Sequence, residues 1–366
     1  MRFRTIRADQ VGSLLRPAAV LRARAAHRQG RIGLEQLRRV EDEAILDALR
    51  LQRHVELDVF TDGEYRRGAW QTDMAEAVEG FVADRIAMAW HGPNAGVEGS
   101  EAQVVGGKLR QRGRLTAHES AFLKQHAPGP FKVTIPSAST FRDASYKPGL
   151  TDRFYPARSD LLDDLVRIVR GEIEGLVEEG VPYVQIDAPR LSYYVDPRIR
   201  EQMRQSGVDP ERSLEEAIAA ENACLDGIDR AAVTLGFHLC RGNSRSRWRA
   251  EGGYEPIAEK LFGSLEHDRL LLEYDSDRSG GFEPLRFVPK GKTVVLGLVT
   301  TKRGELESQE ELLRRIDEAS KYVAVEDLAL SPQCGFASVA EGNLLSPDEQ
   351  WRKLELVVDT ARKVWT

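Results

Sequence analysis

The sequence predicts an α/β protein, a single (β/α)₈ barrel domain that spans residues 1–366. Eight short apolar runs recur along the chain, and segments with helical periodicity separate them, which is typical of a parallel sheet covered by helices. No Gly-x-Gly-x-x-Gly turn follows the first apolar run. This absence disfavours an open dinucleotide-binding sheet, and eight repeats favour closure into a barrel.

Most of the apolar runs lack alternation, which suits strands that are buried on both faces. Strands are expected at Thr5–Ala8, Leu57–Thr61, Phe131–Ile135, Tyr183–Ile186, Gly236–Leu239, Leu270–Tyr274, Val294–Val299 and Val325–Leu330.

Helices are expected where apolar residues recur at helical spacing. The stretch Asp160–Glu179 carries an apolar stripe four residues apart, with Ser159 placed to cap its start and Gly180 to stop it. The other helices are expected at Gln36–Arg53, Ser213–Thr234, Ser308–Tyr322 and Asp348–Val364.

Residues 67–129 are too many for a simple connection, so we expect a hairpin-like excursion over the barrel mouth after the second strand. This excursion holds a helical piece, a glycine-rich region and a second helix. Residues 193–210 are expected to form a second, shorter excursion.

Composition narrows the class of partner. The net charge of −6 argues against a nucleic acid or an acidic membrane surface, and we expect neither as a partner. No run of about 18 apolar residues is present, and the N-terminus lacks an apolar signal core, so a cytoplasmic protein is expected. Three widely spaced cysteines do not form a disulfide framework; in a reducing compartment they are free thiols, ligands or nucleophiles.

Polar side chains gather where the predicted strands end, which is where barrels of this class place their active sites. His238 and Cys240 share one side of the fifth strand, because alternate residues of a strand point the same way. Cys334 leaves the eighth strand and Glu273 ends the sixth. These donors suit zinc, which would activate a substrate thiol as thiolate. A His-x-Cys pair alone is usually core packing, and we interpret the helical Cys224 as packing too.

Three further residues are candidates for substrate binding. Asp187 ends an apolar strand, where a carboxylate needs a partner, and it either grips a substrate ammonium or pairs with Arg190. Glu64 either holds the amine or pairs with the arginines that follow it. Ser13 follows Gly12 at a strand exit and either binds a carboxylate or belongs to a plain turn.

The segments RADQVGSLLRP, FTDGEYRRGAW, KVTIPSAS, YVQIDAP, FHLCRGN, LLEYDSDRSG and LALSPQCGFAS together resemble the catalytic barrel of the cobalamin-independent methionine synthases. The resemblance covers nearly the whole chain. It implies zinc bound by His238, Cys240, Glu273 and Cys334, and it places homocysteine against Ser13, Glu64 and Asp187. It also implies methyl transfer from a folate to the homocysteine thiolate, with Glu273 and Asp187 as the residues closest to the chemistry.

The chain departs from that family on the methyl-donor side. It is too short to hold the additional N-terminal barrel of the full-length enzymes. The family's pterin-packing tryptophan has no match in Pro136-Ser137-Ala138-Ser139, and the family's histidine acid is replaced near Lys302. The methyl donor therefore stays open between a folate and a corrinoid protein.

Three other hypotheses for the function remain. One is a different thiol alkyltransferase, similar to the epoxyalkane:coenzyme M transferases. Another is a metal-free lyase similar to uroporphyrinogen decarboxylase, and the last is a non-catalytic binder.

Overall fold

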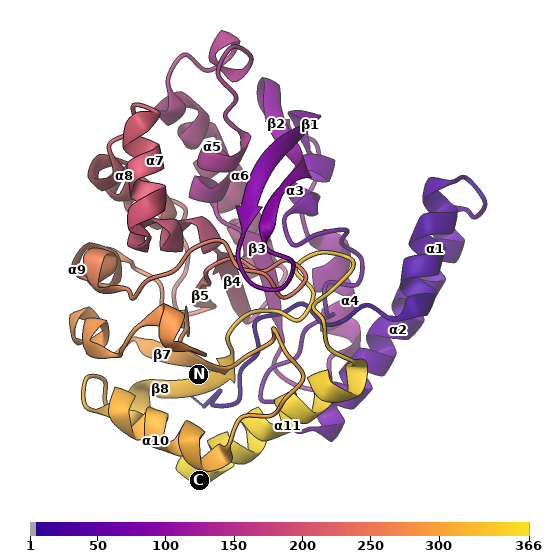
Figure 1. The fold of residues 1–366 in the computed structure, drawn as a ribbon. Helices are drawn as coiled ribbons and strands as arrows, with labels where there is room; N and C mark the ends of the chain where they lie inside the picture. Colours follow the sequence, from indigo (N-terminus) through magenta and orange to yellow (C-terminus); the bar gives the residue numbers. More distant parts are fainter. Residues whose placement is uncertain (1–4, 366) are drawn as a thin grey trace.

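The computed structural model describes residues 5–365 and shows a central parallel sheet surrounded by helices (Figure 1). Six strands lie side by side in chain order, and all of their residues are buried. They are β3 (Lys132–Pro136), β4 (Tyr183–Asp187), β5 (Thr234–Leu239), β6 (Arg269–Glu273), β7 (Thr293–Val299) and β8 (Leu328–Pro332). Five of them confirm the predicted positions. The eighth begins later than predicted, because Val325–Asp327 forms a 3₁₀ turn.

Two extended segments close the ring where the first two strands were predicted. Ala8 forms a parallel bridge with Leu330 of β8, and Phe60 forms one with Phe131 at the start of β3. The Asp58 amide donates to the Ala8 carbonyl at 3.3 Å, so backbone hydrogen bonds also join the two segments. The architecture is a (β/α)₈ barrel in which the first two members pair by single bridges instead of long ladders.

Helices pack around this ring. Three confirm their predictions closely: α2 (Leu34–His54), α10 (Gln309–Ser320) and α11 (Pro347–Val364). The remaining long ones are α1 (Ala18–Arg28), α5 (Ala138–Ser145), α6 (Arg158–Glu178), α7 (Pro197–Gln205), α8 (Pro210–Ala223) and α9 (Glu255–Ser264).

Two helix boundaries were predicted wrongly. Ser159 lies inside α6 and does not cap it; the Asp160 carboxylate accepts from the Ala157 amide at the helix start instead. The segment after Ala223 is not helical, because the chain turns through Gly227 at a φ of 82° before β5 begins. Cys224 is therefore at a helix end, although it is buried as predicted.

The 67–129 segment, expected as a hairpin-like excursion, contains a long antiparallel hairpin whose two strands the sequence analysis did not identify. Its elements are α3 (Thr72–Ala77), β1 (Val78–Trp90), β2 (Gly96–Gln111) and α4 (Ala117–His126). The strands are largely exposed or half-buried and rich in glycine, so no continuous apolar run marks them. At the hairpin tip, His91 and Trp248 exchange backbone hydrogen bonds of 2.8 and 3.1 Å, which join the hairpin to the loop after β5.

The barrel interior holds a buried polar network below the mouth. Lys132 Nζ donates to Asp9 Oδ1 at 2.8 Å and to Gln185 Oε1 at 2.7 Å, and Arg269 reaches Asp9 Oδ2 at 3.1 Å. A buried ion pair persists only when such further hydrogen bonds complete it. The network therefore gives the strands that carry the site a fixed polar support.

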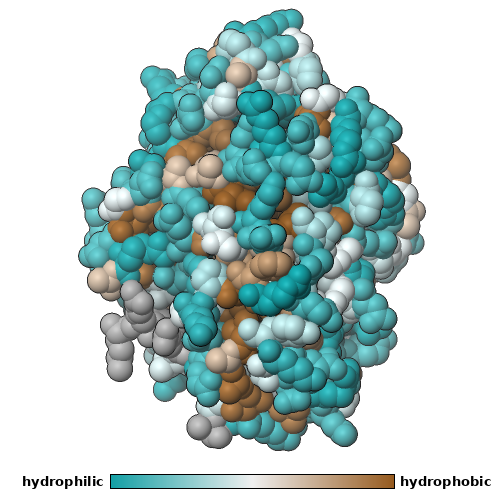
Figure 2. All heavy atoms as spheres, turned by 90° about the vertical axis from the view of Figure 1, so that its left-hand side faces the viewer, coloured by the Kyte–Doolittle hydropathy of each residue, from teal (hydrophilic) through white to brown (hydrophobic). Residues whose placement is uncertain are grey.

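The outer surface is mostly hydrophilic. Figure 2 shows one face on which apolar residues lie in narrow hollows between hydrophilic ones. Within residues 5–365, no helix combines the length and apolar character needed to cross a membrane.

We predict that Gly297→Ala destabilises the barrel by about 1–3 kcal/mol, the usual cost of overpacking. A Cβ at Gly297 would lie 2.8 Å from Gln333 Cα and 2.8 Å from Leu272 O, both backbone atoms that cannot move aside. Urea unfolding measures the change. The control is Gly263→Ala in α9, where a Cβ meets open space; equal stability of the two variants would contradict the prediction.

Candidate metal centre

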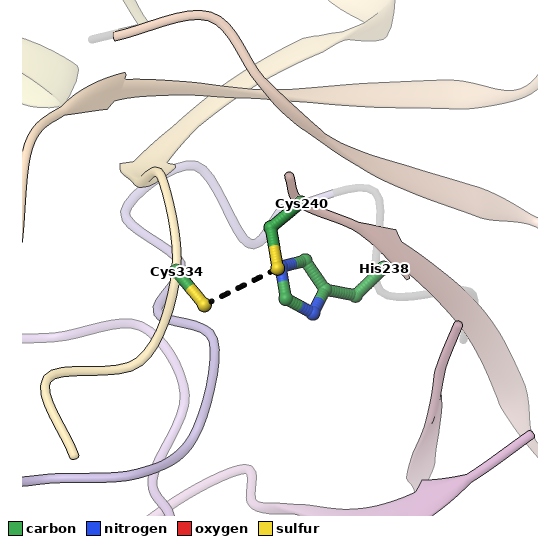
Figure 3. Close-up of side chains that lie close together, drawn as sticks. All are labelled: His238, Cys240 and Cys334. Atoms are coloured by element: carbon green, nitrogen blue, oxygen red, sulfur yellow. Dashed lines mark hydrogen bonds between the residues drawn. The ribbon is translucent and has the colours of Figure 1, made fainter. Parts of the chain in front are cut away.

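Two thiols and an imidazole meet at the C-terminal end of the barrel (Figure 3). His238 belongs to β5, Cys240 follows that strand, and Cys334 follows β8. The two Sγ atoms are 3.5 Å apart, and the ligand atoms of the three residues lie within 4.8 Å of one another. All three side chains are buried. Residues far apart in sequence are thus brought together as predicted.

The ring of His238 is held by Asp187. Its Nδ1 lies 2.9 Å from Asp187 Oδ1, and Gln185 Nε2 donates to the same oxygen at 2.8 Å. His238 Nε2 is buried without a hydrogen-bond partner. Burial lowers the pKa of His238, but Asp187 and Cys334 outweigh it and raise that pKa to about 10. Asp187 therefore contacts a histidine, and its sequence alternative, a pair with Arg190, is not formed.

Cys334 is the more acidic thiol of the pair. The hydrogen bond with Cys240 lowers the pKa of Cys334 well below its usual range, and His238 acts in the same direction. The contact raises the pKa of Cys240. Cys334 therefore loses its proton more readily than Cys240 does.

Glu273 lies outside this cluster of ligand atoms, although the sequence predicted it as the fourth zinc ligand. Its Oε1 accepts from Arg278 Nε at 3.0 Å, and its Oε2 accepts from the Arg241 amide at 2.9 Å. Burial raises the pKa of Glu273, but Arg278, Arg241 and Lys302 together lower it. Glu273 is thus an ionised carboxylate that its arginine neighbours hold.

Glu64 takes an unusual backbone conformation, with a φ of 57°, next to Gly63 at 69°. Left-handed conformations are uncommon for residues other than glycine and tend to be kept at functional sites. Glu64 Oε1 accepts from the Thr134 hydroxyl at 3.0 Å. Arg67, which the sequence offered as a partner, is 4.0 Å from Oε1 and makes shorter contacts to Glu119.

Glu64 and Asp187 each keep one carboxylate oxygen without a hydrogen bond. Glu64 Oε2 is buried without a hydrogen-bond partner. Among the residues that the structure describes, none donates to Asp187 Oδ2, because both donors use Oδ1. Burial raises the pKa of Glu64 to about 7; Asp187 and Asp62 add to the rise, while Arg67 and Arg16 oppose it. A cation placed between Glu64 and Asp187 would favour the ionised form of Glu64 and so lower its pKa.

Ser13 lies against the segment that carries Cys334. Its Oγ accepts from the Ala337 amide at 3.4 Å, and its carbonyl accepts from the Phe336 amide at 2.8 Å. A Cβ at Gly335 would fall 1.9 Å from Ser13 Oγ, so glycine allows this close approach.

Sequence reasoning missed three residues that position the site. Gln185 holds Asp187, and Arg278 holds Glu273. The Asn243 amide donates to the Gly335 carbonyl at 2.8 Å and so ties the loop after β5 to the loop after β8. Gln185 could have been found from the sequence, since it lies two residues before Asp187 on the same face of its strand.

The three clustered side chains suit a zinc ion. Two thiolates on one zinc at about 2.3 Å lie roughly 3.8 Å apart in a tetrahedron, and the sulfurs here are 3.5 Å apart. The unpartnered His238 Nε2 supplies a nitrogen donor. Asp187 fixes the opposite ring nitrogen, as carboxylates commonly do for metal-bound histidines.

Comparisons with known proteins show the family of this chain. A family model described as cobalamin-independent synthase, catalytic domain, matches residues 6–363. The uncharacterized protein YxjH of Bacillus subtilis is 39% identical over 98% of this chain and 94% of its own length. A methionine synthase of Sulfurisphaera tokodaii is 25% identical over 89% of this chain and 84% of its own length.

Solved structures share the fold. A Listeria monocytogenes protein assigned as a vitamin-B12 independent methionine synthase superposes with a TM-score of 0.74 at 29% identity, covering 98% of both chains. A B12-independent methionine synthase from a Shewanella species, solved in complex with selenomethionine, also gives 0.74. At 20% identity, with 97% of this chain and 96% of the other covered, this second match shows the fold alone.

We predict that Cys334→Ala purifies with less than a tenth of the zinc bound by the unchanged protein. The substitution removes one of the two sulfurs in the cluster. Metal content after gel filtration measures the loss. Cys224→Ala is the matched control, since Cys224 is equally buried but lies outside the cluster. Full zinc content in Cys334→Ala would contradict the assignment.

We predict that Glu64→Gln stabilises the protein at pH 8 but not at pH 5. Because the folded-state pKa of Glu64 is raised to about 7, its favourable neutral form is lost as pH rises through that value. Glutamine keeps an acceptor for Thr134 and never ionises. The gain in unfolding free energy should reach the order of 2–3 kcal/mol at pH 8. Denaturant unfolding across this pH range measures it, and a pH-independent difference would refute it. The exposed Glu35→Gln serves as control.

Proposed function

Because the chain belongs to the family of cobalamin-independent synthase catalytic domains, we propose that it is a zinc-dependent methyltransferase that methylates the thiol of homocysteine. One observation carries this proposal. Two thiols and an imidazole lie next to two carboxylates, Glu64 and Asp187, and each carboxylate keeps an oxygen free. A thiol that also bears an amine matches both halves of this site.

In this proposal His238, Cys240 and Cys334 hold the zinc. Glu273 is proposed as the fourth ligand, which requires one of its oxygens to leave Arg278 or the Arg241 amide. When bound, zinc would supply the positive charge that lowers the pKa of a substrate thiol, so that the thiol reacts as thiolate at neutral pH. Asp187 keeps the proton of His238 on Nδ1 and leaves Nε2 free for the metal.

The substrate's amino acid end is proposed to lie between Glu64 and Asp187. Glu64 Oε2 and Asp187 Oδ2 would accept from the ammonium group, and its charge would favour ionised Glu64. Ser13 is proposed to contact the substrate carboxylate from the segment beside Cys334. Holding both ends of the molecule fixes the sulfur for attack, which supplies much of the rate of a bimolecular transfer.

The methyl donor is proposed to be a methylated folate or a methylated corrinoid protein. After β3, where the family packs the pterin on a tryptophan, Ser137 instead caps α5 by accepting from the Thr140 amide. The donor side of this chain is thus built from other residues.

Two alternatives fit the geometry less well. Coenzyme M bears a sulfonate and no amine, so the free oxygens of Glu64 and Asp187 would repel it. A metal-free lyase has no use for two sulfurs 3.5 Å apart beside an unpartnered imidazole nitrogen.

The experiment compares homocysteine with coenzyme M on the cobalt-substituted protein, where the absorption of cobalt reports thiolate binding. We predict that Asp187→Asn weakens homocysteine binding at least tenfold and leaves coenzyme M unaffected. Asparagine still offers an oxygen to His238 and Gln185 but has lost the charge. The exposed Asp348→Asn is the control.

Methionine formation is then assayed with methylated folate and with methylcobalamin as donors. Equal binding of the two thiols to the unchanged protein would overturn homocysteine as the acceptor. Absence of metal from the purified protein would support the lyase.

A further inference from the structure

Three cations lie close to the thiol cluster without a carboxylate partner. Within residues 5–365, no carboxylate oxygen comes within 4.0 Å of the side-chain nitrogens of Arg190, Arg249 or Lys302. Most other arginines near this mouth are paired; Arg278 contacts Glu273 and Asp275, for example. In a chain with a net charge of −6, three cations without a direct carboxylate contact require an explanation here.

Arg190 and Arg249 flank one aromatic ring. Their guanidinium carbons lie 5.7 and 6.0 Å from the centre of the Tyr193 ring, and all three residues are half-buried. The preceding residue, Ser192, donates to the Cys240 carbonyl, which places the trio beside the cysteine. The only interaction of Arg190 in the described chain is with that ring, so its N–H groups are free to bind a ligand.

Two buried N–H groups nearby also lack acceptors. They are Arg249 Nε and Trp90 Nε1, the latter at the end of β1. Both residues pack against Gly242: a Cβ there would lie 3.0 Å from Arg249 Cβ and 3.7 Å from Trp90 Cζ3. A buried donor without an acceptor costs free energy and is uncommon in native structures, so a bound acceptor is expected.

Lys302 adds charge on the other side of the same glycine. Its Nζ donates to Gly242 O at 3.1 Å, Asn243 Oδ1 at 3.1 Å and Arg247 O at 3.4 Å, all of them neutral acceptors. The positive charge of Lys302 is therefore not neutralised by these contacts.

The hairpin tip contacts the residues of this region. Arg249 Nη1 donates to the Ala89 carbonyl at 2.6 Å, and Arg247 lies 5.1 Å from the centre of the Trp90 ring. The hairpin and the loop after β5 thus each contribute an unpartnered donor to this region. Guanidinium groups and an indole N–H suit an oxyanion, because both donate hydrogen bonds and neither accepts them.

We propose that Arg190, Arg249 and Trp90 form an anion-binding subsite at the barrel mouth, which binds a carboxylate or phosphate group carried by the methyl donor. This inference rests on the proposed methyltransferase function. It assigns the donor side to the hairpin and the acceptor amine to Glu64 and Asp187. The hairpin side of the mouth would then bind the anionic group of the methyl donor, and the carboxylate side would bind the cationic amine of the acceptor.

Glutarate and inorganic phosphate are the probes, titrated into the zinc-loaded protein by calorimetry. We expect one or both to bind, and the preferred probe tells a carboxylate donor from a phosphate donor. Arg190→Gln should weaken binding at least fivefold, and Arg190→Gln with Arg249→Gln at least twentyfold. Arg85→Gln, an exposed arginine of the same hairpin, removes the same charge and should change binding less than twofold.

Trp90→Phe tests the indole donor separately, since it keeps the ring and removes the N–H. A threefold or greater loss of binding supports the subsite. The inference is overturned if neither probe binds at 20 mM, or if the double variant binds like Arg85→Gln. Homocysteine binding to cobalt, unchanged in the double variant, shows that failure here is not failure of the proposed function.

Discussion

The hydrogen bond between Asp187 Oδ1 and His238 Nδ1 is the contact on which the site depends. The second ring nitrogen lies with the two sulfurs in the cluster. Both contacts to the Asp187 carboxylate are made by Oδ1, so no described residue donates to its Oδ2. Gln185 holds the same carboxylate oxygen, and Lys132 holds Gln185, so the contact is anchored in the buried network around Asp9. Because every link is buried, the low local dielectric strengthens it. The candidate metal centre and the proposed acceptor pocket therefore share the Asp187 carboxylate, so that binding at one would change the electrostatic field at the other.

Closure of the barrel is the second constraint. Cys240 and Cys334 meet because β5 and β8 end on the same rim of the ring. The segment with Ser13 reaches that rim through the bridge between Ala8 and Leu330. Gly335 permits the close approach of the two loops, and the Asn243 amide joins them. A shift in any of these would separate the sulfurs, so the geometry of the cluster reports on the closure of the whole ring.

The mouth is divided by charge. Glu64 and Asp187 place two carboxylates on one part, where burial raises the pKa of Glu64 to about 7. Arg190, Arg249 and Lys302 gather positive charge near the hairpin tip. In the proposed function, such separation would orient two substrates of opposite charge before they contact each other. The 67–129 segment would then take part in substrate selection through its hairpin tip.

The sequence by itself determined the class of fold and five of the strands, because buried strands appear in it as apolar runs. It also determined the grouping of His238 and Cys240 with Cys334, because alternate residues of a strand point to the same face. It also identified Glu64 and Asp187 as unusual carboxylates. Only the tertiary structure decided that Asp187 holds His238, that Glu273 lies among arginines, and that the hairpin reaches the loop after β5. These contacts join residues 51, 5 and 157 positions apart through side-chain reach and loop paths, which leave no periodic trace in the sequence.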